Sequence, residues 1–360
     1  LLLRYLKKIF YNSVAELRKM KKSLMTLGVL ALFVLMAYGQ EKKFALYSVA
    51  FYNMENLFDT IHDEGKNDYE YLPNGTNQWN TMKYKAKLKN MSEILSMLST
   101  DKLPMGPAII GVSEIENYRV LEDILKQPAL ADRGYQYVHY EGADQRGVDC
   151  AFFYNPKLFE LTNSKLVPYV YINDTVHKTR GFLIASGNIA GEKMHFIVNH
   201  WPSRAAASPA RERAGEQVRA IKDSLLREDS AAKIVIMGDM NDDPMDKSMA
   251  VALGAKRKPV DAGPTDLYNP WWDTLKKGYG TLMYKGKWNL FDQIVFTGNL
   301  LGTDRSTLKF YKHEIFSRDF MFQKEGKYKG YPKRTQAGGV WLNGYSDHLP
   351  TIIYLIKEVK

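Results

Sequence analysis

Carboxylate, amide and histidine side chains of this sequence stand at the ends of short apolar runs. Glu114 follows AIIGV, His200 follows FIVN, and Asp239 follows KIVIM, while Asp347 and His348 precede a last run, TIIYL. The group offers oxygen and imidazole ligands and no cysteine, which suits a hard cation such as magnesium or manganese better than structural zinc. No HExxH, CxxC, Walker A or GxSxG pattern competes with it. The spacing therefore predicts one metal-dependent site assembled from distant parts of the chain.

The apolar runs are predicted strands, and they must bring these side chains together. Strand ends converge on one edge of a sheet, so residues far apart in the sequence can meet there. Residues 44–53 alternate bulky and small side chains, and 108–112 is continuously apolar, as in a strand buried on both faces. Apolar residues at helical spacing predict helices at 79–98 and 209–227. Further strands are predicted at 135–140, 148–154, 182–186, 195–199, 233–237, 291–296, 308–311 and 351–355.

The organisation favours one large domain over two. A chain of 360 residues would allow about two domains of ordinary size. However, no Ser/Gly/Pro linker divides residues 40–360, and no stretch shows the regular self-similarity of a repeat protein. We therefore expect residues 40–360 to form a single α/β (α+β) domain that is rich in strands.

Six motifs occur in the order NMEN, GVSEIEN, NHWPSR, GDMND, WNLFDQ and SDHLP. This order resembles the endonuclease/exonuclease/phosphatase superfamily, which includes pancreatic-type deoxyribonuclease, abasic-site endonucleases, neutral sphingomyelinases and inositol polyphosphate phosphatases. GDMND followed by SDHLP is the specific part, and the resemblance covers about residues 46–356. It implies a deoxyribonuclease I-like fold, a four-layer αββα sandwich, with a divalent metal (Mg²⁺, or alternatively Mn²⁺). It also implies hydrolysis of a phosphoester by direct attack of water.

The resemblance assigns metal binding to four residues. Glu114 is expected to be the principal metal carboxylate, and Asn53 and Glu55 to support the metal or the phosphate. Asp347 is expected to assist the metal and the leaving group. Glu55 stands where several members of the superfamily have aspartate, so coordination through water is an alternative to direct coordination.

Catalysis is assigned in the same way. His348 is expected to be the general base, oriented by Asp292, because one ring nitrogen must hold a proton while the other faces the water. Asp239 is the alternative base, or it orients the attacking water. Asn241 is expected to contact the scissile phosphate, and His200 to contact phosphate or to act as an acid. From local chemistry alone, Asp239 and Asn241 could instead close a strand through an Asx turn.

The residues that would bind the rest of the substrate are less defined. Arg204 of NHWPSR could clamp a phosphate through its planar guanidinium, and a structural salt bridge is an equal alternative. Aromatic side chains between two predicted strands could stack on bases, and packing in the core or contact with glycans or lipid are the alternatives. These are Tyr268, Trp271, Trp272, Tyr279, Tyr284 and Trp288.

The N-terminal segment has the features of a secretory signal. Residues 24–36 form a 13-residue apolar run behind two lysines, and small residues follow it. The run is shorter than the roughly 20 residues of a membrane-spanning helix. We expect Met20 to be the start and residues 1–39 to be removed by cleavage near Gly39. This predicts a secreted or periplasmic protein with no stable membrane anchor, and an uncleaved anchor is the alternative.

The formal charge of +10 gives weaker support to a nucleic-acid substrate than it first suggests. Residues 1–39 hold seven of the 50 basic and one of the 40 acidic residues, so residues 40–360 carry only +4. We therefore expect a secreted metal-dependent phosphoesterase whose first candidate substrates are DNA or RNA. A phospholipid or small-molecule phosphatase is the second reading, and a binding module with an inactive site is the third. A monomer is expected, and no protein partner can be inferred.

Overall fold

The computed structural model of this protein describes residues 2–38, 43–172, 174 and 176–359. The chain divides into two compact units, Leu1–Phe44 with Glu358–Lys360, and Ala45–Lys357. In the first unit, α1 (Leu2–Tyr38) is a single helix. None of the helices in the described ranges is both long and apolar enough to span a bilayer. The predicted cleavage site near Gly39 lies outside the described residues, so its cleavage stays a prediction.

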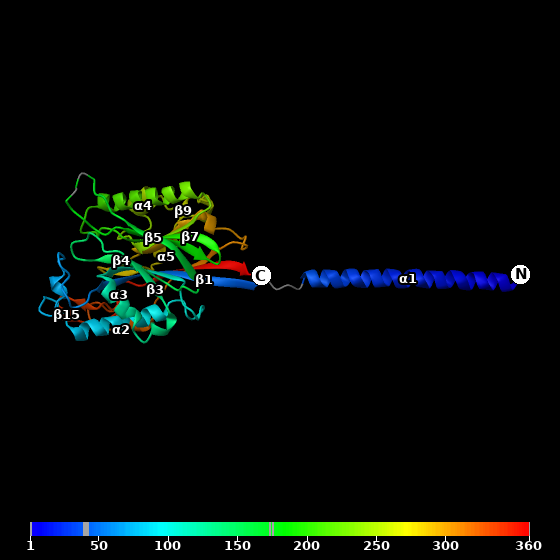
Figure 1. Cartoon of the computed structure of the whole chain (residues 1–360), viewed down its shortest axis with the longest axis horizontal. Helices are drawn as coiled ribbons and strands as arrows, with labels where there is room; N and C mark the ends of the chain where they lie inside the picture. Colours follow the sequence, from blue (N-terminus) through cyan, green and yellow to red (C-terminus); the bar gives the residue numbers. More distant parts are fainter. Residues whose placement is uncertain (1, 39–42, 173, 175, 360) are drawn as a thin grey trace. The chain divides into compact units, whose positions relative to one another are not determined.

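Two mixed six-stranded sheets form the centre of the second unit (Figure 1). The first sheet has the order β13-β16-β1-β2-β4-β3, and the second has the order β5-β6-β7-β8-β12-β9. The first consists of β1 (Lys43–Leu57), β2 (Ile109–Ile115), β3 (Gln136–His139), β4 (Asp149–Tyr154), β13 (Lys309–Ile315) and β16 (Thr351–Val359). The second consists of β5 (Phe159–Val167), β6 (Phe182–Ile189), β7 (Glu192–His200), β8 (Lys233–Asp239), β9 (Leu267–Tyr268) and β12 (Asp292–Thr297).

Helices cover the outer faces of the two sheets. Figure 1 shows α4 (Ser208–Glu228) on one side of the stacked strands, and α2 (Thr81–Met97) with α3 (Tyr118–Leu125) on the other. The Asn80 side chain caps α2 by accepting a hydrogen bond from the backbone N–H of Lys83. The other α-helix and the other strands are short: α5 (Trp272–Lys276) and the two hairpins β10 (Leu282–Tyr284) with β11 (Lys287–Asn289) and β14 (Gln336–Ala337) with β15 (Val340–Trp341). Short 3-10 helices and one π-helix (Ser248–Leu253) lie in the connections.

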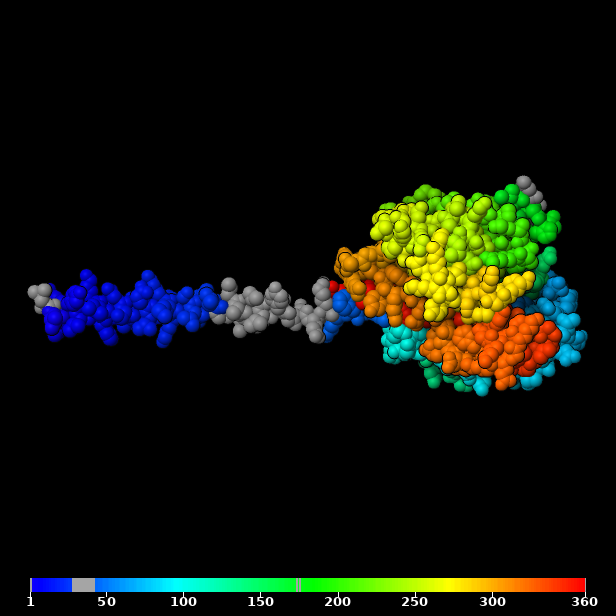
Figure 2. Space-filling view, turned by 180° about the vertical axis from the view of Figure 1, so that it is seen from behind, coloured from blue at the N-terminus to red at the C-terminus, as the bar shows by residue number. Residues whose placement is uncertain are grey.

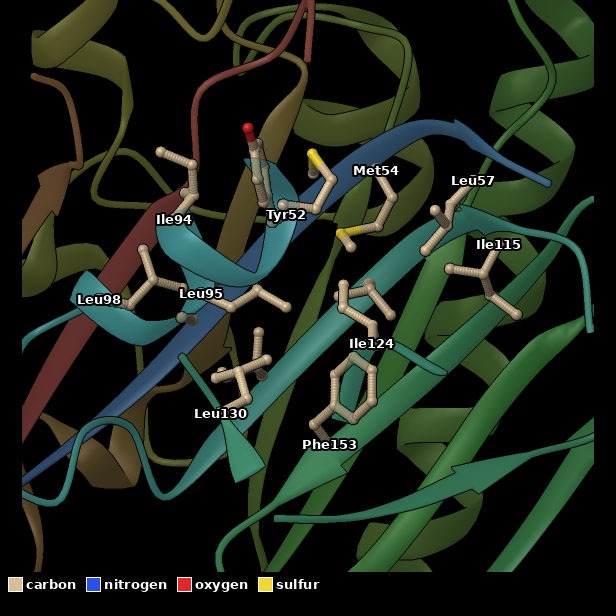
Figure 3. Packing of buried hydrophobic residues seen from close by; sticks show 14 of the residues in the cluster. Tyr52, Met54, Leu57, Ile94, Leu95, Leu98, Ile115, Ile124, Leu130 and Phe153 are labelled. Carbon is tan, nitrogen blue, oxygen red and sulfur yellow. The ribbon is translucent and has the colours of Figure 1, made fainter. Parts of the chain in front are cut away.

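Three apolar cores separate the four layers. One lies between α2, α3 and the first sheet, where Leu95 and Ile124 pack near Tyr52 and Phe153 (Figure 3). The second joins the inner faces of the two sheets, and the third packs the second sheet against α4. This confirms the four-layer αββα sandwich. Because each layer is held on a buried face, the strand ends are fixed relative to one another.

The predicted helices and the predicted strands are present, with ends that shift by a few residues. β5 was not predicted, because it is an edge strand with mostly polar, exposed side chains and no clean alternation. Of the aromatic residues considered for base stacking, Trp271 is fully buried between the sheets, whereas Tyr279 and Tyr284 are exposed.

Candidate active site

Three neighbouring strands place three predicted catalytic residues in one row. His200 ends β7, Asp239 ends β8, and Asp292 begins β12. The strand register pairs His200 with Asp239 and Asp239 with Asp292. All three side chains are buried. The convergence of strand ends predicted from the apolar runs is therefore present in this sheet.

The first sheet contributes Asn53 and Glu114 through adjacent parallel strands. Asn53 pairs with Ser113, and the register then shifts in both β1 and β2. Glu114 lies at the shift in β2 with a φ of +59°. Such a bulge re-aims a side chain, and a positive φ in a non-glycine residue is a strain that concentrates at functional sites. The Glu114 Oε1 accepts a hydrogen bond from Asn53 Nδ2 at 3.1 Å.

A hydrogen bond connects the two sheets at the site, because Asn53 Nδ2 of the first sheet also donates to Asp239 Oδ2 of the second at 3.0 Å. His200 lies beside both carboxylates, with Nε2 3.6 Å from Glu114 Oε1 and 3.8 Å from Asp239 Oδ2. Burial, together with the positive charges of Arg180 and Arg146, lowers the pKa of His200 well below its ordinary value. His200 is therefore neutral, so one of its nitrogens is a donor and the other an acceptor.

His348 and Asp292 form the predicted pair. The His348 Nδ1 lies 2.7 Å from Asp292 Oδ2, and its Nε2 lies 3.9 Å from both Asp239 Oδ2 and Asp347 Oδ1. Burial alone would lower the pKa of His348, but Asp292 and Asp239 outweigh it, so the pKa is raised well above the ordinary value. Asp292 thus fixes one ring nitrogen and leaves Nε2 directed at Asp239 and Asp347. With Glu114, these two residues form what we call the carboxylate cluster.

Asp239 carries both a local and a long-range role. Its Oδ1 accepts a hydrogen bond from the backbone N–H of Asn241 at 2.9 Å, which is the Asx turn considered as the local alternative. Its Oδ2 is the atom that faces Asn53, His200 and His348. Burial, with the nearby charges of Asp292 and Glu114, raises the pKa of Asp239 to about 7. One carboxylate oxygen of Asp239 therefore forms the Asx turn, and the other remains available to the active site.

Asn241 and Arg204 are close to this cluster but are engaged with other groups. The Asn241 Nδ2 donates to the carbonyl oxygen of Trp201 at 3.1 Å, and Asn241 has a φ of +51°. The Arg204 guanidinium donates to Asp243 and Asp246 and lies over the ring of Phe291. Arg204 thus makes the structural salt bridge that was the alternative to phosphate binding, and its contact with phosphate stays a prediction.

Glu55 and Asp347 lie in an ionic network that the sequence did not reveal. Arg334 donates from Nε to Glu55 Oε1 at 2.9 Å, and its Nη2 lies 3.0 Å from Asp347 Oδ2. The fully buried Lys87 places its Nζ 3.8 Å from Glu55 and donates to the Tyr345 carbonyl at 2.7 Å. Burial raises the pKa of Glu55 to about 7, and Asp347 adds to the rise. The network ties the loop before His348 to β1 and α2.

Comparison with a protein-family model tests the resemblance that the six motifs suggested. The model of the Endonuclease/Exonuclease/phosphatase family matches residues 48–357, which is most of the chain. The chain belongs to the endonuclease/exonuclease/phosphatase family. No curated protein sequence matches it significantly.

Solved structures of the endonuclease/exonuclease/phosphatase family share the fold at low sequence identity. A Bacteroides thetaiotaomicron member matches with a TM-score of 0.55 and 15% identity, covering 89% of this chain and 98% of that one. A mannosyl-6-phosphatase of the same organism matches with a TM-score of 0.53 and 15% identity over 86% of this chain and 99% of that one. D. rerio TDP2 complexed with a single-strand DNA product matches with a TM-score of 0.51 and 15% identity over 86% and 99%. At these identities the likeness concerns the fold.

The endonuclease/exonuclease/phosphatase family implies a divalent metal, and the residues present fit one. Glu114, His200 and Asp239 each offer a ligand atom within 4.8 Å of the others. Two of these three residues are carboxylates, so oxygen donors outnumber nitrogen donors, as a hard cation prefers. Within the described residues, Oδ1 of Asp292 and Nδ1 of His200 are buried without a hydrogen-bond partner. Glu114, His200 and Asp239 therefore fit the divalent cation that the family implies.

A cavity of about 360 Å³ is lined by residues of the network around Glu55. Glu55 and Arg334 line it, together with the rings of Tyr71, Trp79 and Tyr328. Tyr71 and Trp79 belong to a chain of ring contacts that fixes their positions. The cavity has room for one compact group, and it adjoins the site through Asn56, whose backbone N–H donates to Glu114 Oε2 at 3.0 Å.

Proposed function

We propose that this protein is a secreted, divalent-metal-dependent phosphoesterase that cleaves its substrate by direct attack of water. The observation that carries this proposal is the His348–Asp292 pair directed at Asp239, on the same side as the Asn53–Glu114 pair of the other sheet. Secretion is supported by the n-region, short apolar run and small residues of the N-terminal sequence.

His348 is the preferred acceptor of the proton that leaves the attacking water. Because Asp292 and Asp239 raise the pKa of His348, it accepts that proton only in its unprotonated form, which gains population as the pH rises. Asp292 holds the Nδ1 proton and stabilises the imidazolium that forms when Nε2 takes a second proton. Asp239 is the alternative base, since its pKa of about 7 leaves the carboxylate able to accept a proton near neutral pH. His348 and Asp239 lie 3.9 Å apart, so a water held between them can pass its proton to either group.

The phosphate oxygens repel an incoming nucleophile, so the site must offset their charge. A divalent cation held by Glu114, with support from Asn53, Glu55 and Asp347, would neutralise part of that charge. From the chain itself, the proposed hydrogen-bond donors to the phosphate oxygens are neutral His200 and the second amide N–H of Asn241, whose other N–H donates to the Trp201 carbonyl. Such preorganised donors act without reorganisation during the reaction.

A phosphodiester of DNA or RNA is the first candidate substrate. The motif order supports this, and one structure that shares the fold is of TDP2 with a single-strand DNA product. The cavity beside Glu55 favours a second candidate, a phosphomonoester of a compact polar alcohol such as a sugar, because aromatic rings and amides together bind sugar rings. A structure of a mannosyl-6-phosphatase also shares the fold.

The test is a hydrolysis panel of single-stranded DNA, RNA, bis-p-nitrophenyl phosphate, p-nitrophenyl phosphate, mannose 6-phosphate and sphingomyelin. Each substrate is assayed with magnesium, with manganese and with EDTA. We expect turnover of the diesters, loss with EDTA and recovery with added metal. Turnover of mannose 6-phosphate alone would favour the second candidate. Absence of metal-dependent turnover on every substrate would contradict the proposed function.

A further inference from the structure

Two surface segments near the active site hold the net positive charge of the domain. Residues 284–288 and 323–334, which we call the basic strip, contain seven basic residues and one acidic residue. The basic strip therefore carries +6, whereas residues 40–360 as a whole carry +4 and the remainder carries −2. A weakly basic domain thus has a strongly basic region. Its basic residues are Lys285, Lys287, Lys324, Lys327, Lys329, Lys333 and Arg334.

The two segments of the basic strip are adjacent in the fold. The hydroxyl of Tyr331 accepts a hydrogen bond from the backbone N–H of Gly286 at 2.6 Å. The rings of Trp288 and Phe322 also contact each other edge to face. Figure 2 shows the segment around residues 320–340, in orange, at the surface of this unit. The strip is therefore one continuous surface.

Among the described residues, the lysines of the basic strip have no carboxylate partner, whereas Arg334 pairs with Glu55 and Asp347. Within the described part of the chain, none of its six lysines forms an ion pair, and all except Lys333 are exposed. Exposed aromatic rings are interleaved with them: Tyr284 is 62% and Tyr328 is 50% exposed. Lys285 lies over the ring of Tyr284, and Lys327 lies over the ring of Tyr328. Unpaired ammonium groups beside exposed rings are the pattern of a surface that binds a polyanion with stacking groups.

The last residue of the basic strip contacts residues of the candidate active site. Arg334, its last residue, bonds Glu55 and reaches Asp347, which precedes His348 in the chain. Tyr328 and Arg334 also line the cavity that opens beside Glu55. A strand that lies along the lysines would therefore bring one of its phosphates to the carboxylate cluster.

We propose that the basic strip binds the phosphate backbone of a single-stranded nucleic acid and guides it to the active site. This inference rests on the proposed phosphoesterase function and names the substrate class. Lysines that neutralise phosphates release condensed counterions, which makes binding favourable and dependent on salt. Tyr284 and Tyr328 offer rings on which unpaired bases stack, and a duplex hides those base faces. The same interleaving of rings and charges favours a strand over a flat anionic membrane.

The test compares two triple variants of the full chain. Lys324→Gln/Lys327→Gln/Lys329→Gln removes three charges from the basic strip and leaves the cavity lining unchanged. Lys157→Gln/Lys193→Gln/Lys258→Gln is the matched control. Its exposed lysines lie outside the strip, and Lys157 and Lys193 flank the strand ends opposite those that bear Glu114 and His200. Binding of a fluorescent oligothymidylate is measured by anisotropy in EDTA between about 50 and 200 mM salt. Melting temperatures verify that both variants fold.

The strip variant should bind the oligonucleotide about tenfold more weakly, and its slope of log K against log salt should fall by about 2. The control should stay within about twofold, and all three proteins should hydrolyse bis-p-nitrophenyl phosphate equally. Equal loss of binding in both variants, or binding only to phosphatidylglycerol vesicles, would overturn the inference. Strip-dependent binding by a protein that hydrolyses no phosphoester would contradict the proposed function and leave the strip assignment standing.

Discussion

The side-chain amide of Asn53 lies 3.0 Å from the carboxylate of Asp239 and joins the two sheets at the active site. Both residues are buried, and the same amide nitrogen donates to Glu114. The separation of the two sheets is set by the apolar core between them. One amide therefore fixes the relative positions of a candidate metal ligand and a candidate base.

Replacing Asn53 by Ala should disturb that geometry without removing a ligand carboxylate. We expect turnover of bis-p-nitrophenyl phosphate, or affinity for magnesium, to fall by about 10- to 100-fold, as for other groups that orient ligands. Steady-state kinetics over a magnesium titration measure both quantities. Asn188→Ala, on the surface of the β6–β7 hairpin, is the control, and similar kinetics for the two variants would contradict the positioning role.

Lys87 should contribute more to stability than an ordinary helix lysine. Replacing it by Met removes a buried partner of Glu55 and two hydrogen bonds to the loop before His348, so we expect a loss of about 3 kcal/mol in the free energy of unfolding. Urea unfolding measures it. Lys89→Met, on the exposed side of the same helix, should change it by less than about 0.5 kcal/mol. A double variant with Glu55→Gln should recover part of the loss. An equal effect of the two lysine variants would exclude a special role for Lys87.

Glu192 should make stability depend on acid pH. Burial alone would raise its pKa, but the contacts with Lys233 and Lys357 outweigh burial and lower it. A lowered carboxylate pKa stabilises the fold above the unfolded pKa of about 4.3, and the stabilisation disappears as the pH falls through the folded value.

Glu192→Gln should therefore lower the free energy of unfolding by about 1 kcal/mol at pH 7, and the difference should vanish at strongly acid pH. Urea unfolding across this pH range measures it, with the exposed Glu160→Gln as control. A difference that stays constant from neutral to acid pH would show that the ion pairs are not its cause.

His200 and Asp239 could be located because each stands at the end of a buried strand, whereas Asp292 was assigned from its place in the WNLFDQ motif. An apolar run followed by a polar residue is visible in one sequence, and sheet geometry brings such ends together. Asp239, His200 and Asp292 lie in one row for this reason. The bulge that turns Glu114 toward Asn53 has no such signature, because a positive φ at a glutamate cannot be read from residue type.

The network around Glu55 was missed because its members come from unrelated elements. Lys87 and Thr335 lie 248 residues apart, and the loop that carries Arg334 has no periodic pattern. One signal was present: Lys87 lies on the same face of the predicted helix as Leu88 and Met91, where a charge is unexpected. The basic strip was not predicted because the net charge of residues 40–360 adds its +6 to the −2 of the remainder.

The most direct test of the proposed chemistry is the turnover number of His348→Ala on bis-p-nitrophenyl phosphate at saturating magnesium. The exposed His177→Ala serves as the control, and circular dichroism verifies both folds. We predict that turnover falls by about 10²- to 10⁴-fold in the His348 variant and is unchanged in the control. A folded His348→Ala protein with near-wild-type turnover would contradict the assignment of His348 as the base.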